Sequence, residues 1–274
     1  MGLRRLLATF SLPLATACLA CAGLIGIEDP RYGAGADDAA TDVMAPAEEA
    51  GDAAQPPTRT CDHRPDLLLC DDFEATAIDS SWSQTTTLGS LKLDRSRFKS
   101  GKQSLRVHTD ATTAADPLAE AAIGKSFTPP KAFFTRVWVW FALPISQGTA
   151  AEQIFFNLDG PNSTGLELLV HRQSTAPRLI FNDYATSPTT YVASTAAFPV
   201  DRWTCVETQI DEGAHTSRVF VDGVADDSLP QTGLGLSSVT VVSVGLHFGS
   251  RTDAPAYDVW VDDYAIGPAR IGCD

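Results

Sequence analysis

From about residue 61 onward, apolar and polar residues alternate with a period of two in many short segments. In TRVWVWF (135–141), Arg136, Trp138 and Trp140 would share one face, and the intervening valines and phenylalanine the other. Such alternation is typical of β-strands, in which successive side chains point to opposite faces. Gly, Pro, Asp, Asn and Ser bound the segments, as expected at turns. The pattern predicts strands at about 66–74, 88–95, 103–109, 119–127, 133–142, 153–158, 165–172, 178–184, 190–194, 203–211, 217–222, 239–248 and 257–266.

Many short strands without helical periodicity predict an all-β fold, namely a two-sheet antiparallel β-sandwich or jelly roll. Residues 61–274 are long enough for one large domain of this kind, and no internal repeat is visible in them.

The first 60 residues have a different pattern. Arg4 and Arg5 precede an apolar run from Leu6 to about Leu19, which is the arrangement of a secretory signal peptide and is short for a membrane span. Residues 28–60 are built mainly from Ala, Asp, Glu, Gly and Pro, and they predict a disordered acidic linker. The predicted organisation is a signal peptide at 1–20, a tether at 21–60 and a β-sandwich domain at 61–274.

Two cysteines, Cys18 and Cys21, lie in LATACLACAG at the end of the apolar run. Small residues before a cysteine resemble the lipobox of bacterial lipoproteins, in which the cysteine is acylated and begins the mature chain. Acylation of Cys21 would remove Cys18 and leave four cysteines, an even number suited to disulfides in an oxidising compartment. Parity therefore favours Cys21 over Cys18, and an ordinary Ala-x-Ala cut without lipid is the alternative. The lipoprotein interpretation places the protein in the bacterial cell envelope, at the periplasmic or surface face of the outer membrane.

The formal net charge of −14 bears on the choice of partner. A chain this acidic is repelled by nucleic acid and by anionic lipid. The predicted contact with a membrane is therefore the lipid anchor alone. The charge would also repel polyanionic polysaccharides, unless a local basic patch overrides the mean.

Six motifs follow one another along the domain: CDDFE, SGKQSLRV, TRVWVWFALP, RWTCVETQID, SRVFVDGV and VGLHFGSRTDAPAYDVWVDDYAIG. Their order resembles the concanavalin A-like lectin/glucanase superfamily, which includes laminin G-like domains and several polysaccharide lyases, over nearly all of 66–267. The resemblance implies a concanavalin A-like jelly roll but no particular activity, because this fold carries lectins, hydrolases, lyases and adhesive modules.

The resemblance also implies that the first and last strands are antiparallel neighbours. That arrangement favours the disulfides Cys61–Cys273 and Cys70–Cys205. The main alternative is Cys61–Cys70 with Cys205–Cys273, and the sequence does not decide between them.

No catalytic motif is complete. The glucanase pattern Glu-x-Asp-x-x-Glu is unmet at Glu207-Thr-Gln-Ile-Asp211-Glu212, and EQIFFN carries Phe155 where alginate-lyase-like proteins have a histidine. The candidates that remain for catalysis are Arg136, Glu167, His171 and Glu207, with His171 beside Glu167 or Arg172 as a general-base pair.

Alternate positions on four predicted strands are polar or aromatic and could line the concave surface on which relatives bind sugars. Flat aromatic rings stack on sugar rings, and carboxylates and amides bind hydroxyl groups. The predicted ligand contacts are Arg136, Trp138, Trp140, Glu167, His171, Glu207, Gln209 and His247. The alternative is that the tryptophans belong to the core and the polar residues to a solvated convex face.

Acidic residues lie at both ends of the domain: Asp71, Asp72 and Glu74 in the first strand, and Asp258, Asp262 and Asp263 in the last. On neighbouring strands these hard oxygen ligands would suit a structural Ca²⁺. The predicted ligands are Glu74 and Asp263, then Asp72 and Asp262, and no other cofactor is expected. The alternative is that they are edge charges that prevent strand-to-strand aggregation.

The sequence thus favours an envelope-anchored lipoprotein that displays a lectin-like domain for non-catalytic carbohydrate binding or adhesion. The alternatives are a polysaccharide lyase or glycoside hydrolase acting on an extracellular or cell-wall glycan, and a module that binds a protein partner without a sugar site.

Overall fold

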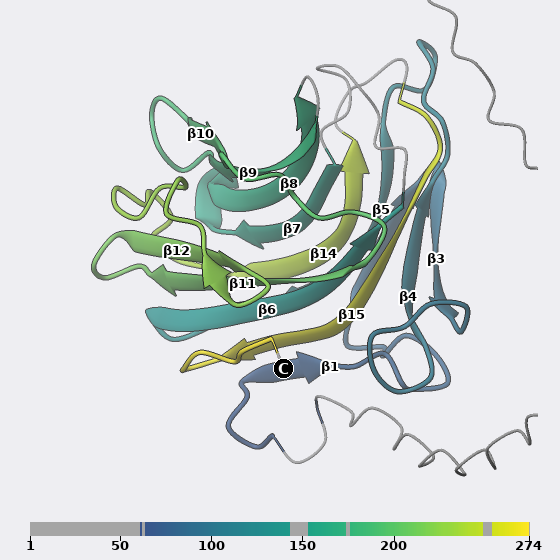
Figure 1. Ribbon diagram of the computed structural model, residues 1–274, viewed down its shortest axis with the longest axis horizontal. Helices are drawn as coiled ribbons and strands as arrows, with labels where there is room; N and C mark the ends of the chain where they lie inside the picture. The colour runs from purple at the N-terminus through teal and green to yellow at the C-terminus, as the bar shows by residue number, and fades with distance from the viewer. Residues whose placement is uncertain (1–60, 62–63, 143–152, 174–175, 249–253, 274) are drawn as a thin grey trace, which may run out of the picture. The chain divides into compact units, whose positions relative to one another are not determined.

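The computed structural model describes residues 61, 64–142, 153–173, 176–248 and 254–273. The predicted signal peptide, tether and lipidated cysteine lie outside them. The described residues form two antiparallel sheets packed face to face, which confirms the predicted β-sandwich (Figure 1). No helix in these residues is long and apolar enough to cross a membrane.

Sheet A has the strand order β13-β12-β11-β6-β15-β4-β3, with β1 paired to β15. Its strands are β1 (Leu69–Asp71), β3 (Gly89–Asp94), β4 (Ser104–Thr109), β6 (Ala132–Phe141), β11 (Trp203–Asp211), β12 (Thr216–Val221), β13 (Val224–Ala225) and β15 (Tyr257–Gly267).

Sheet B has the order β10-β9-β8-β7-β14-β5-β2. Its strands are β2 (Ser83–Thr87), β5 (Ala119–Ser126), β7 (Gln153–Asp159), β8 (Gly165–Gln173), β9 (Ala176–Asp183), β10 (Thr190–Ala193) and β14 (Val241–Phe248), and a 3₁₀ turn, η1 (Pro161–Ser163), follows β7.

The core fills the space between the sheets and takes one residue in two from each strand. In β6 the core residues are Phe133, Val137, Val139 and Phe141, all on one face as the alternation predicts. Phe141 packs edge-on against Phe155, with ring centroids 5.5 Å apart, and against Phe198 at 5.8 Å. Burying such side chains contributes roughly 1.5–3 kcal/mol each, which holds the two sheets together.

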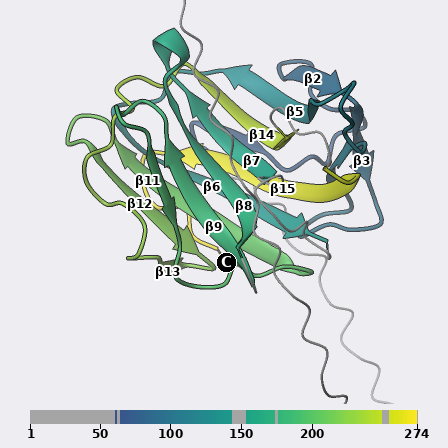
Figure 2. The ribbon, with the colours of Figure 1, turned by 90° about the horizontal axis from the view of Figure 1, so that it is seen from above.

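The strands of both sheets are arched in the same direction (Figures 1 and 2). Strands β7, β8 and β9 lie on the inner side of the arch from β6, so sheet B carries the hollow outer face.

The first and last strands are antiparallel neighbours, as expected, with Leu69 opposite Ile266 and Asp71 opposite Tyr264. The favoured disulfides are nevertheless wrong. The observed pairs are Cys61–Cys70 and Cys205–Cys273, the arrangement kept as the alternative.

Two local folds explain this correction. A turn in which the Leu67 amide donates to the Arg64 carbonyl folds residue 61 back onto Cys70 in β1. After β15, residues 268–273, here called the C-terminal strap, pass over sheet A and reach Cys205 in β11. Strand adjacency alone did not reveal where the chain runs beyond either strand.

Candidate functional site

The outer face of sheet B is hollowed into a groove. Two cavities, of about 110 and 300 Å³, lie on it and share Glu120, Ala122, Asn157 and Ser243 in their linings. The groove therefore runs continuously over β5, β14 and β7, and Glu167 extends it onto β8.

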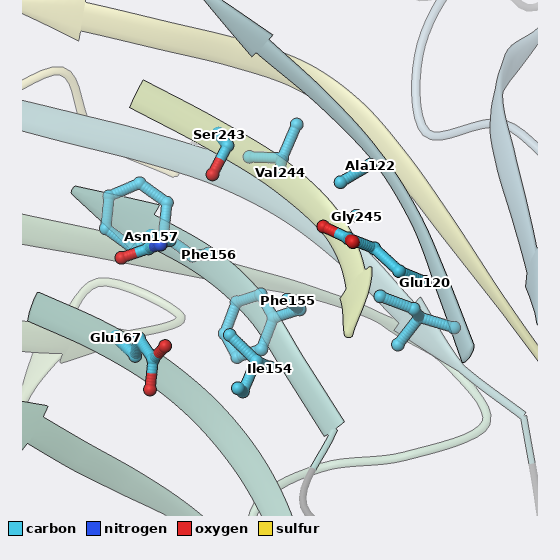
Figure 3. A pocket seen from close by; sticks show the side chains of 11 residues that line it. Glu120, Ala122, Ile154, Phe155, Phe156, Asn157, Glu167, Ser243, Val244 and Gly245 are labelled. Carbon is cyan, nitrogen blue, oxygen red and sulfur yellow. The ribbon is translucent and has the colours of Figure 1, made fainter. Parts of the chain in front are cut away.

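A row of residues crosses the whole sheet along this groove, because the strand registers align one outward-facing residue from each strand. We call it the polar row, and it consists of Ser83, Gly124, Ser243, Asn157, Glu167, Asn182 and Tyr191. Neighbouring strands lie about 4.8 Å apart, so the row is roughly 29 Å long. Figure 3 shows three of its members, Ser243, Asn157 and Glu167, on consecutive strands.

Small residues contribute to the lining of the groove, among them Ala122, Ser243 and Gly245 (Figure 3). At Gly245 a Cβ atom would lie 2.4 Å from the Ala121 carbonyl oxygen, so only glycine fits there. At Gly124 the nearest heavy atom to a Cβ would be 3.7 Å away, in ordinary contact. Backbone packing thus requires Gly245, whereas Gly124 simply leaves room above the sheet.

Hydrogen bonds between side chains hold the groove in shape. Asn182 Nδ2 donates to Glu167 Oε2 at 2.8 Å, and Asn157 Nδ2 donates to Asp159 Oδ1 at 3.0 Å. The Tyr184 hydroxyl donates to the same Asp159 oxygen at 2.7 Å. Burial and the neighbouring Asp159 carboxylate raise the pKa of Tyr184, so the hydroxyl stays protonated and remains a donor. A ligand would therefore meet polar groups whose positions are already fixed.

Asn182 also has an unused acceptor. Its Oδ1 atom is buried and has no hydrogen-bond partner. A buried amide oxygen without a donor is costly to the folded state.

The charge of the groove is negative. Its linings include the carboxylates of Glu120, Asp159 and Glu167 against the ammonium group of Lys125. A uronate chain would meet like charges here, whereas neutral hydroxyl groups would meet hydrogen-bond acceptors.

The structure divides the predicted ligand contacts between the two sheets. Glu167 and His171 lie on the hollow face of sheet B, on either side of Leu169 in β8. Four residues along a strand span roughly 13 Å, so these two do not form the expected general-base pair. His247 belongs to β14 opposite Glu120, but its side chain and that of Arg172 lie outside the description.

The other predicted contacts lie on the outer face of sheet A. They are Arg136, Trp138, Trp140, Glu207 and Gln209. The four catalytic candidates therefore do not converge on one groove, since Arg136 and Glu207 are on the opposite side of the molecule from Glu167 and His171.

Glu207 and Arg136 hold the C-terminal strap instead. The fully buried Glu207 carboxylate accepts from Arg270 Nε at 2.9 Å and from the amides of Ile271 and Gly272. The Arg136 guanidinium donates to the carbonyl oxygens of Gly272 and Asp263, both at 3.3 Å. These contacts position the chain.

The predicted calcium ligands lie near the junction of β1, β4 and β15. The Glu74 carboxylate accepts the amides of Lys102 and Gln103, and Asp262 Oδ2 accepts those of Lys99 and Ser100. Asp263 Oδ1 accepts the Ser100 hydroxyl at 2.9 Å, and Asp72 Oδ1 accepts the Glu74 amide at 3.3 Å. Within the described residues no three His, Cys, Asp or Glu side chains are grouped as a metal ion would require. Calcium binding stays a prediction, and thermal unfolding with and without a chelator checks it.

Comparison with known proteins identifies the fold. No protein-family model matches the chain, and no curated protein sequence matches it. Solved structures do. The cellulose induced protein Cip1 has a TM-score of 0.59 at 18% identity, covering 75% of this chain and 100% of that one. An endo-β-1,4-glucuronan lyase from the fungus Trichoderma reesei has a TM-score of 0.57 at 14% identity, covering 74% and 96%.

The shared feature is the jelly-roll sandwich. A sialidase has it as well, with a TM-score of 0.50 at 12% identity, over 74% of this chain and 18% of that one. Identities this low establish the fold alone, so any activity must be argued from the groove itself.

Proposed function

We propose that the protein binds a neutral polysaccharide along the groove of sheet B. The observation that carries the proposal is the polar row, in which seven strands each place one residue on a line about 29 Å long. Amide, hydroxyl and carboxylate groups on such a line suit the repeated hydroxyl groups of an extended glycan. The carbohydrate-related proteins among the structural neighbours add support at the level of fold.

The negative groove favours a neutral glycan over a uronate. Cleavage of a polyuronate requires cationic groups against the substrate carboxylates, and the two groove linings offer Lys125 beside three carboxylates. Binding without cleavage is therefore the preferred function, and lyase activity is the second candidate.

Binding of the isolated domain to an array of neutral glycans tests the proposal. Asn157→Ala should weaken binding about fivefold, the worth of roughly one hydrogen bond of 1 kcal/mol. Gly124→Leu should abolish it, because the new side chain projects into the groove above β5, where a Cβ has room. Gln209→Ala removes a half-buried amide from the outer face of sheet A and should leave affinity unchanged.

If the domain binds no neutral glycan on the array, the proposal is overturned. Incubation with a panel of polyuronates, followed by ultraviolet detection of unsaturated products, tests lyase activity. Release of such products would show that the protein is a lyase.

We also propose that the protein is displayed from a membrane through a lipidated Cys21. The two disulfides support an oxidising compartment outside the cytosol, where such anchors are attached. Cys21→Ser should move the protein from the detergent phase to the aqueous phase with its far-ultraviolet circular dichroism unchanged. An acyl group found on Cys18, or none in the wild type, would contradict the assignment.

A further inference from the structure

The outer face of sheet A carries a concentration of positive charge that the acidic chain shows nowhere else in so short a stretch. Residues 92–106 contain six lysines and arginines against one aspartate, in a chain of net charge −14. This segment comprises β3, the turn that follows it and β4. We call its cations the basic face, and they are Lys92, Arg95, Arg97, Lys99, Lys102 and Arg106.

Strand register extends the basic face into a row of tryptophans. Lys92 is opposite Arg106, Arg106 is opposite Trp260, and Trp260 is opposite Trp140, which is opposite Trp203. The row crosses five strands, a length of roughly 19 Å.

The turn after β3 folds over these rings and fixes its own cations there. The Arg97 guanidinium carbon lies 4.2 Å from the ring centroids of both Trp140 and Trp260. Lys99 Nζ lies 4.2 Å from the Trp138 ring. Cation–π contacts of this kind hold a charge in place without neutralising it.

The carboxylates nearby are already occupied. Asp94 accepts from the Trp260 indole and the Ser96 amide, and Asp258 forms a bidentate pair with Arg106. Among the described carboxylates, none forms an ion pair with Lys92, Arg97 or Lys102. Glu74, Asp262 and Asp263 also accept hydrogen bonds from the turn, so the positive charge that this face offers to solvent is chiefly that of the exposed Lys92, Arg95 and Lys102.

We propose that the basic face binds an anionic polysaccharide, one bearing carboxylate or sulfate groups. Lys92 and Arg106 at one end of the row, with Arg97 and Lys99 held over its tryptophans, offer several cations to repeated anionic groups on an extended chain, whereas a single small anion would use only one or two of them. The half-buried Trp140 and Trp203, which pack edge-to-face with ring centroids 6.0 Å apart, continue the row and add apolar surface to it.

A bilayer fits this surface less well. Membrane-surface segments insert protruding apolar side chains, whereas Trp138 and Trp260 are less than a tenth exposed and lie beneath the cations. The turn after β3 contains a single large hydrophobic residue, Phe98, which is exposed, so the turn offers one protruding apolar side chain to a bilayer. The disulfides, which belong to an oxidising compartment, weigh against nucleic acid.

This site is independent of the groove, because the two lie on outer faces of different sheets. A domain with both sites could hold a neutral and an anionic glycan at once.

The test uses the full chain with surface-immobilised polygalacturonate and dextran sulfate, which separate carboxylate from sulfate recognition. The wild type should bind at least one of them, with affinity falling about tenfold or more between about 50 and 200 mM salt, as charges are screened. The variant Lys92→Gln/Arg95→Gln/Lys102→Gln changes exposed side chains and should lose at least about tenfold in affinity.

Two further variants separate the basic face from net charge. Arg64→Gln/Lys131→Gln/Arg218→Gln removes the same charge elsewhere and should bind within about twofold of the wild type. Asp258→Asn removes the carboxylate that pairs with Arg106 and should strengthen binding.

Equal loss in both triple variants would overturn the proposal, as would no binding to either polyanion. Preferential binding to phosphatidylglycerol vesicles or to duplex DNA would also overturn it and would assign the face to a membrane or to nucleic acid. Lys92→Gln/Arg95→Gln/Lys102→Gln should bind neutral glycans as the wild type does. The proposal for the groove and the proposal for the basic face can therefore be rejected independently.

Discussion

Two glutamates, one half-buried and one fully buried, show how one sequence pattern can serve two different ends. Glu167 and Glu207 each occupy an outward position in an alternating strand. Glu167 lines the groove with an asparagine as partner, whereas Glu207 is fully buried beneath the C-terminal strap. The burial of Glu207 comes from strap residues more than 60 positions downstream, and a local sequence pattern does not include such distant residues.

Asp258 gives a pH-dependent prediction at this scale. Burial alone would raise its pKa, but hydrogen bonds from Arg106 at 2.8 Å and His108 at 3.0 Å outweigh burial and lower the pKa below its ordinary 3.8. The folded state then binds fewer protons than the unfolded state, so the stabilisation is complete above pH 3.8 and is lost as the pH falls through the folded-state value.

Asp258→Asn should therefore lower the free energy of unfolding by about 1–2 kcal/mol at pH 7, and the difference should shrink below pH 3.8. Urea denaturation of the wild type and the variant, at pH 7 and below pH 3.8, measures this difference in the free energy of unfolding. Asp66→Asn, which breaks an exposed pair with Arg64, is the control and should change little. A loss that is constant with pH would contradict the assigned linkage.

At the scale of the element, alternation predicted most strands because the core takes one residue in two. It failed where a turn interrupts an apolar run. The strand expected at 66–74 ends at Asp71, where Asp71 Oδ1 accepts the Phe73 amide and Phe73 adopts a positive φ of 54°. It also missed β2, because the sequence SQTTT is entirely exposed and has no apolar face.

The groove could not be located in the same way. Period-two patterns indicate which residues share a face, and the groove residues Glu120, Asn157, Asn182 and Ser243 all occupy such polar positions. They do not indicate which sheet is hollow, because curvature is a property of strands packed together. The tryptophans of β6 alternate in the same way but belong to sheet A, which does not carry the groove.

Strand β14 gives a prediction for the groove floor. Gly245→Ala should lower the free energy of unfolding by about 2–3 kcal/mol, since its Cβ would collide with the Ala121 carbonyl oxygen. Gly124→Ala, on the neighbouring strand β5, should be neutral or stabilising by up to about 1 kcal/mol, because a Cβ there has ordinary contacts. Equal effects in denaturant titrations would show that the sheet relaxes around Gly245.

At the scale of the whole molecule, the two disulfides should differ in weight. Cys61–Cys70 closes a loop over a sequence separation of 9, and Cys205–Cys273 one over 68. Loop-closure entropy then predicts a stabilisation of about 2.5 kcal/mol for the first and about 4.4 kcal/mol for the second.

Double replacement by alanine, Cys61→Ala/Cys70→Ala against Cys205→Ala/Cys273→Ala, tests this by thermal and urea unfolding. The second pair also fastens the C-terminal strap over Glu207, so its loss should be the more destabilising. The reverse order would mean that the strap stays in place without its covalent link.

The strand order has a consequence for how the protein is made. The strands that join the halves of the two sheets come late in the sequence, since β14 lies between β7 and β5, and β15 between β6 and β4. A nascent chain synthesised as far as β12 holds pieces of both sheets with nothing to connect them. Folding must therefore wait until residues 241–267 have been translated. Until then the incomplete sheets leave strand edges unpaired, which is the kind of exposed surface that promotes aggregation of folding intermediates.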